Sequence, residues 1–155
     1  MKATLPPDFA DLLTAFAEAE VRALVIGGYA VAWHGRPRAT KDLDLFVDAS
    51  PENLARAVRA LAAFGAPLAV IESLRTMRAD EVIWFGSPPL RIDLLGHVDG
   101  LAFESAWARA IRVTVDDHEI RVLSLEDLLA SKRAAGRLQD LADVALLTAP
   151  PDPTD

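Results

Sequence analysis

The stretch RALVIGGYAVAWHGRPRATKDLDLFV, residues 22–47, predicts a strand, a glycine step, a short helix and a second strand. Residues 22–26 form a short, mostly apolar run that Gly27-Gly28 interrupts. A short helix over 29–34 follows, and a glycine and a proline end it. In residues 42–47 acidic and apolar side chains alternate, which is typical of a strand with one buried face. This order of elements indicates a fold in which strands and helices alternate.

Further helices and strands are expected along the rest of the chain. Helices are expected over 8–20, 51–64, 103–110, 124–135 and 137–147, and strands over 81–85, 90–95, 111–115 and 119–122. Residues 68–80 fit neither pattern. The order predicts one α/β (α+β) domain over residues 1–147, with a small mixed β-sheet, flanking helices and a C-terminal helical hairpin. A disordered tail is expected over 148–155.

Composition narrows the class of protein. The chain has 155 residues, of which 52% are hydrophobic and 25% charged, as in globular proteins. It has no cysteine, which excludes disulfides and thiolate–zinc sites, and its three histidines lack ligand spacing. No apolar run approaches the roughly 18 residues of a membrane span, so a cytoplasmic location without a membrane partner is expected. The net charge of −7 argues against non-specific coating of nucleic acid, although contact with one RNA end through a local basic patch stays open.

Three aspartates are the candidate catalytic and metal-binding residues. On one strand Asp42 and Asp44 share a face, with Cα atoms about 7 Å apart. They are either a solvated strand face or two ligands that converge on one ion. Asp93 lies inside a second apolar strand, where an unpaired carboxylate is costly. It either pairs with a basic side chain such as Arg91 or joins Asp42 and Asp44 at a site suited to Mg²⁺ or Mn²⁺.

The glycine step and the basic loop after it are candidate nucleotide-binding segments. Gly27 and Gly28 let a ligand approach the backbone, and a helix N-terminus offers N–H groups to a phosphate. The alternative is a tight turn that needs only positive φ. The loop 34–41 holds three basic residues and includes Thr40 and Lys41. It either binds a triphosphate beside its metals or simply neutralises the aspartates with surface cations.

Together these residues resemble the DNA polymerase β superfamily of nucleotidyltransferases. The pattern is Gly27-Gly28, thirteen further residues, Asp42-Leu43-Asp44, and then Asp93 on a later strand. Residues 86–95 and 132–143 resemble small bacterial members near the abortive-infection toxins and the minimal nucleotidyltransferases of toxin–antitoxin pairs. The resemblance covers nearly the whole chain. It departs from the superfamily at Gly28, where many members have a phosphate-binding serine, and the chain is shorter than the abortive-infection toxins.

The resemblance implies a polymerase β-like fold and a metal-dependent reaction. A nucleoside monophosphate would move from a nucleoside triphosphate to a hydroxyl acceptor, which is an RNA end, a protein or a small molecule. Asp42, Asp44 and Asp93 would be the catalytic and metal-binding residues. Lys132 would contact phosphate, and Asp140 would position that lysine or the base. A toxin–antitoxin partner protein is also implied.

Other interpretations stay open beside this one. The polar face of the last helix is alternatively a solvated face, on which Arg137 pairs with Asp140 or Asp143. The chain is alternatively an inactive, antitoxin-like binding module, or a nucleotide-sugar glycosyltransferase whose D-x-D motif binds a metal. Lys132 is expected on the surface of its helix. The three tryptophans are interpreted as core residues, with base stacking by Trp84 as the alternative.

Overall fold

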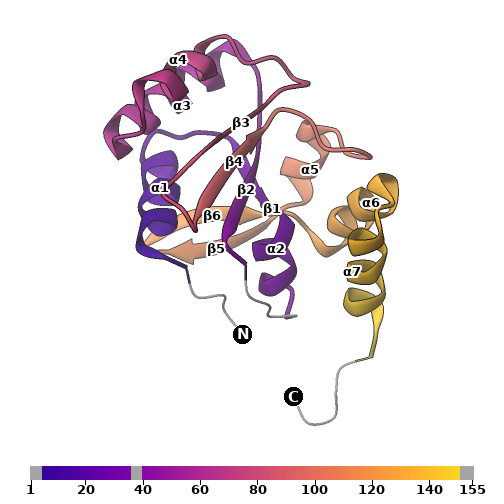
Figure 1. The fold of residues 1–155 in the computed structure, drawn as a ribbon. Helices are drawn as coiled ribbons and strands as arrows, with labels where there is room; N and C mark the ends of the chain where they lie inside the picture. The colour runs from indigo at the N-terminus through magenta and orange to yellow at the C-terminus, as the bar shows by residue number, and fades with distance from the viewer. Residues whose placement is uncertain (1–4, 36–39, 151–155) are drawn as a thin grey trace.

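A computed structural model describes residues 5–35 and 40–150 of the chain, which form a sheet flanked by helices (Figure 1). The helices are α1 (Pro7–Glu18), α2 (Gly27–Trp33), α3 (Pro51–Phe64), α4 (Leu68–Arg75), α5 (Phe103–Arg109), α6 (Leu125–Ala135) and α7 (Leu138–Thr148). The strands are β1 (Ala23–Ile26), β2 (Asp42–Val47), β3 (Val82–Phe85), β4 (Arg91–Leu95), β5 (Ile111–Val115) and β6 (His118–Val122). The expected elements are confirmed, with bounds that shift by a few residues.

The sheet is mixed, with the strand order β3-β4-β2-β1-β6-β5. The pairs β1/β2, β3/β4 and β5/β6 are antiparallel, while β2/β4 and β1/β6 are parallel. In the β2/β4 register Asp44 lies opposite Asp93, and in the β1/β2 register it lies opposite Ile26. Strand pairing therefore places Asp44 between Asp93 and Ile26, the last residue before the glycine step.

The two faces of the sheet are covered differently. Leu43 and Leu45 are fully buried on the face that α1, α3 and α4 cover, where Phe64 of α3 meets Phe85 of β3 with ring centroids 6.4 Å apart (Figure 1). On the opposite face, Phe46 packs edge-on against Phe103 of α5. Only part of this second face is covered, and the aspartates lie on it because side chains alternate along β2.

Residues 68–80, which the sequence left undecided, include a helix. The helix α4 begins after Pro67, and its buried residues Ile71 and Leu74 lie one turn apart on the side that packs on α3. With only two buried apolar positions, the segment gives a weak periodic signal. Burial against α3 therefore stabilises a helix that the local sequence did not specify.

The interpretation of Trp84 as a core residue is wrong. Trp84 is 66% exposed, because β3 is an edge strand and the outward face of this edge is not covered. Trp33 and Trp107 are partly buried and pack against the core, as expected.

At the C-terminus α7 continues to Thr148, one residue beyond the expected helix end, and the expected tail falls largely on residues 151–155, outside the described residues. Within residues 5–35 and 40–150, none of the helices combines the length and the apolar character that crossing a membrane requires.

Candidate functional site

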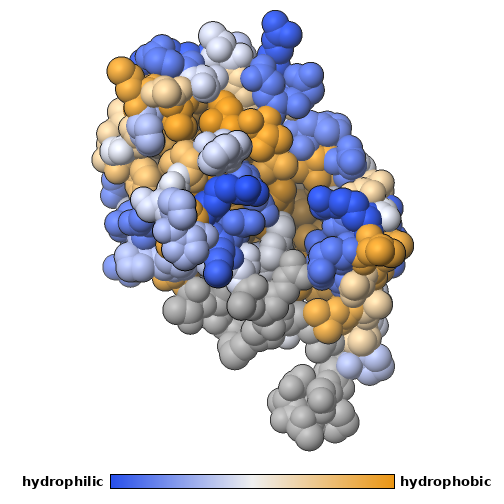
Figure 2. Space-filling model, in the orientation of Figure 1, coloured by the Kyte–Doolittle hydropathy of each residue, from blue (hydrophilic) through white to orange (hydrophobic). Residues whose placement is uncertain are grey.

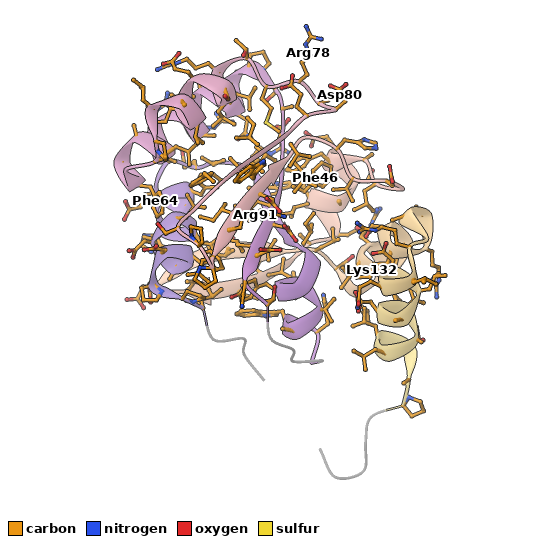
Figure 3. The ribbon with its side chains drawn as sticks, in the orientation of Figure 1. Phe46, Phe64, Arg78, Asp80, Arg91 and Lys132 are labelled. Atoms are coloured by element: carbon orange, nitrogen blue, oxygen red, sulfur yellow. The ribbon has the colours of Figure 1, made fainter. Side chains whose placement is uncertain are left out.

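A cleft of about 660 Å³ lies between the aspartate-bearing face of the sheet and the helices α6 and α7. Figure 2 shows the surface hollowed between these parts, and Figure 3 shows Arg91 on the sheet and Lys132 on α6 at two sides of it. Six of the nine predicted site residues line this cleft: Gly27, Asp42, Asp44, Asp93, Lys132 and Asp140. The fold therefore gathers residues that lie far apart in the sequence around one cleft.

The three aspartates crowd one another on the floor of the cleft. Burial raises the pKa of the Asp44 carboxyl to about 7, aided by a hydrogen bond with Asp93 and by the negative charges of Asp93 and Asp42. A cation that entered the cluster would favour the ionised form of this carboxyl and lower its pKa. The aspartates thus form an electrostatically unfavourable group that is suited to bind a cation.

Arg91 supplies positive charge to this cluster. Its guanidinium donates a hydrogen bond of 3.1 Å to Asp93, forms a salt bridge with it at 3.0 Å, and lies 3.9 Å from an oxygen of Asp42. The salt bridge that the sequence offered as an alternative for Asp93 is therefore present, together with the clustering of the three carboxylates. Arg91 lies two residues before Asp93 on the same strand face, so strand alternation alone could have paired them.

The described side chains contain no group of three His, Cys, Asp or Glu residues already arranged to hold a metal ion. The chemistry of the donor set nevertheless fits magnesium or manganese, since Asp42, Asp44 and Asp93 offer only carboxylate oxygens from one sheet face. A bound metal would compete with Arg91 for the carboxylate oxygens of Asp93.

The two glycines have different tasks. Gly27 has φ +67°, and a Cβ at this position would collide with the carboxylate of Asp44. A Cβ on Gly28 would lie 2.9 Å from the hydroxyl oxygen of Thr40. That hydroxyl donates to the carbonyl of Asp42 over 3.3 Å. Gly27 therefore lets Asp44 approach the backbone, while Gly28 and Thr40 support the start of β2 from outside the cleft.

The basic loop is described only in part. Gly28, Thr40 and Lys41 are not among the residues that line the cleft. Lys41 is exposed, and its carbonyl accepts a hydrogen bond of 2.9 Å from the backbone N–H of Arg91. The remaining two basic residues of the loop, at positions 36 and 38, lie outside the described residues.

The helices α6 and α7 bring a buried ion cluster to the opposite wall. The Lys132 ammonium lies 2.7 Å from Asp143 and 3.7 Å from Asp140, and Arg137 lies 2.6 Å from Asp140. The expected pairing of Arg137 with Asp140 is confirmed. Lys132, Asp140 and Asp143 are all buried, so the expected surface position of Lys132 and the solvated face for the two aspartates are wrong.

The helix α7 buries charged residues and exposes apolar ones, the reverse of an ordinary amphipathic helix. Its carboxylates face inward toward Lys132, whereas Leu138 is 89% exposed. Figure 2 shows hydrophobic atoms on the outer surface of the α6–α7 pair and hydrophilic atoms beside the hollow. The sequence missed Asp143 as a cluster member because its partner Lys132 lies on another helix, where local spacing gives no signal.

The raised pKa of Asp44 predicts how metal-free stability depends on pH. The folded-state pKa of about 7 exceeds the ordinary value of 3.8, so the folded state holds a proton that the unfolded state has released between these values. The free energy of unfolding should therefore fall as pH rises from about 4 to 7, because of this group. In Asp44→Asn this contribution disappears. Urea denaturation in EDTA at pH 5 and pH 8 should show that the free energy of unfolding of Asp44→Asn, relative to that of the parent, is higher at pH 8. Parallel pH profiles of the two proteins would contradict this prediction.

The comparisons with known proteins concern the family and the fold of the chain. A family model described as nucleotidyl transferase AbiEii toxin, type IV TA system, matches residues 11–155. Among solved structures, the chain is similar to a Thermotoga maritima protein provisionally assigned as a nucleotidyltransferase, with a TM-score of 0.56 and 16% identity over 92% of this chain and 94% of that chain. This likeness shows the nucleotidyltransferase fold, and no curated protein gave a significant match. Because the family model spans residues 11–155, the chain belongs to the AbiEii nucleotidyltransferase toxin family of type IV toxin–antitoxin systems.

Proposed function

We propose that this chain transfers a nucleoside monophosphate from a nucleoside triphosphate to a hydroxyl acceptor in a magnesium- or manganese-dependent reaction. The observation that carries the proposal is the clustering of Asp42, Asp44 and Asp93 on one sheet face of the cleft in a chain of this family. The acceptor is an RNA end, a protein or a small molecule. Membership of a type IV toxin family also supports an antitoxin as the partner.

Asp42, Asp44 and Asp93 would hold the metal. When bound, divalent cations neutralise phosphate charge and lower the pKa of the attacking hydroxyl. The carboxylate donors and the pKa of about 7 at Asp44 support this assignment, since a cation would relieve their mutual repulsion. Arg91, released from Asp93, would remain beside the cluster as a cation for substrate phosphate.

The transfer itself is a displacement at the α-phosphorus. The acceptor oxygen forms a bond to this phosphorus, the bond to the bridging oxygen of the β-phosphate breaks, and pyrophosphate leaves with the electron pair. Asp93 accepts the proton of the attacking hydroxyl. Its carboxylate is suited to this role because it lies at the cleft floor beside Asp44.

The other predicted residues bind or support the nucleotide. Lys132 contacts a phosphate from the opposite wall, and Asp140 holds this lysine in place. Gly27 gives space to Asp44, while Gly28 and Thr40 shape the start of β2. Exposed Lys41, directly before Asp42, attracts the anionic triphosphate.

Calorimetric titration of magnesium with and without a nucleoside triphosphate tests the proposal. Magnesium should bind much more tightly with the triphosphate present, because phosphate oxygens complete its ligands. Asp44→Asn should lose this coupling. Asp127→Asn, which alters a buried carboxylate that pairs with Arg109 outside the cleft, should keep it. Absence of coupling in the parent would reject the enzymatic proposal and favour an inactive binding module.

A further inference from the structure

The side chain of Trp84 lies in an unusual place for a tryptophan. It is 66% exposed, on the edge strand β3, and in the β3/β4 register it lies opposite Asp93. Residues opposite each other in adjacent strands point to the same side of the sheet, about 5 Å apart. Trp84 therefore extends the aspartate-bearing face by one strand, beyond Asp93 and away from Gly27.

The surroundings of Trp84 suit an uncharged ring. Val82, two residues earlier on the same face, is 54% exposed and lines the cleft. Asp80 and Glu81 also line the cleft, and Figure 3 shows Asp80 on the end of the loop that leads into β3. Their negative charges disfavour a phosphate at this end, whereas an apolar strip with acidic neighbours accepts the flat face of a base.

Arg91 links this strip to the candidate catalytic carboxylates. Its guanidinium carbon lies 6.0 Å from the centre of the Trp84 ring, while its nitrogens bind Asp93. An indole, a guanidinium and a carboxylate thus follow one another across the sheet. This arrangement places an aromatic surface next to Asp93, the carboxylate that we propose accepts the proton of the acceptor hydroxyl.

We propose that Trp84 is a platform on which a nucleobase stacks at the β3 side of the cleft. The base belongs either to the triphosphate or to a nucleic acid that ends in the acceptor hydroxyl. Stacking on an aromatic side chain is tolerant of base identity, because every base has a π-face. This inference rests on the proposed function and adds the residue that orients a base relative to the metal-binding face.

Two variants of Trp84 separate stacking from structure. Trp84→Phe keeps an aromatic ring, whereas Trp84→Leu keeps an apolar side chain of moderate size without one. Because Trp84 is mostly exposed, both variants should fold, which circular dichroism and urea denaturation would verify. Binding is measured with magnesium for three probes: ATP, inorganic tripolyphosphate without a base, and a short single-stranded RNA.

The three probes identify the source of the base. Trp84→Leu should weaken the binding of either ATP or RNA by about tenfold, the scale of one lost stacking interaction. Trp84→Phe should bind both nearly as tightly as the parent does. If Trp84→Leu loses affinity for ATP but not for tripolyphosphate, the stacked base belongs to the triphosphate. If it loses affinity for RNA alone, the base belongs to the acceptor. The probe whose base stacks, ATP or RNA, should also quench tryptophan emission in the parent and not in Trp84→Phe.

Failure of the inference differs from failure of the proposed function. If the parent binds magnesium with tripolyphosphate, and Trp84→Leu binds ATP and RNA as tightly as the parent, the stacking role is overturned and the metal site stands. If the parent binds no triphosphate with magnesium, the proposed function fails, and with it the inference. If Trp84→Leu loses the same affinity for tripolyphosphate as for ATP, Trp84 is a structural residue and the stacking role is also overturned.

Discussion

Asp93→Asn should lower turnover by about 10²-fold or more, the usual scale for the loss of a positioned base, while magnesium and triphosphate still bind through Asp42 and Asp44. Asparagine has nearly the size of aspartate, but its amide cannot accept the proton of the acceptor hydroxyl. Turnover is measured as incorporation of labelled nucleotide in a cell extract, with pyrophosphate release as a second readout. Calorimetry on the same preparation gives the triphosphate affinity.

A buried aspartate outside the cleft provides the matched control. Asp127 is buried and accepts hydrogen bonds of 2.8 to 3.2 Å from Arg109, much as Asp93 does from Arg91. Asp127→Asn should therefore lower stability, yet each folded molecule should turn over as the parent does. Parental turnover in Asp93→Asn would exclude Asp93 as the base. Loss of triphosphate binding in this variant would instead make Asp93 a ligand that binding requires.

Lys132→Ala should reduce the free energy of unfolding by about 3–5 kcal/mol, because it leaves two buried carboxylates without their ammonium partner. Lys132 is only 8% exposed, with Asp143 at 2.7 Å and Asp140 at 3.7 Å. Urea denaturation at neutral pH measures the loss. The exposed neighbour Arg133 on the same helix gives the control, since Arg133→Ala should change stability by no more than about 0.5 kcal/mol. Equal stability of Lys132→Ala and the parent would show that the cluster is not structural.

A second variant separates this structural role from phosphate binding. Replacing the pair together, Lys132→Met with Asp143→Asn, removes both charges and should recover much of the lost stability. Arg137 still compensates Asp140 in this variant, at 2.6 Å. Its affinity for magnesium and triphosphate then reports on the phosphate contact alone. Parental affinity would remove Lys132 from the nucleotide site and leave Asp42, Asp44 and Asp93 unaffected.

The strand β2 and the helix α7 differ in how far local spacing predicts the surroundings of their acidic residues. On β2, alternation of side chains placed Asp42 and Asp44 on one face from the sequence alone. On α7, helical spacing correctly grouped Asp140 with Asp143, but a solvent-exposed face, one of the two interpretations of that pattern, is wrong because both residues are buried. Charged helix faces usually lie outside, whereas here a buried cation on another helix compensates the buried carboxylates. Lys132 is that cation, and nothing in its own helix indicates it.

The sequence by itself determined the order of the elements, the face that carries Asp42 and Asp44, and the glycine step ahead of them. These features depend on periods of 2 and 3.6 residues and on turn residues, all of which act over a few positions. Only the tertiary structure decided that Asp44 meets Asp93, that Lys132 is buried, and that Trp84 is exposed. Local periods show which side chains share a face, but strand order and helix packing decide which faces meet and which remain in water.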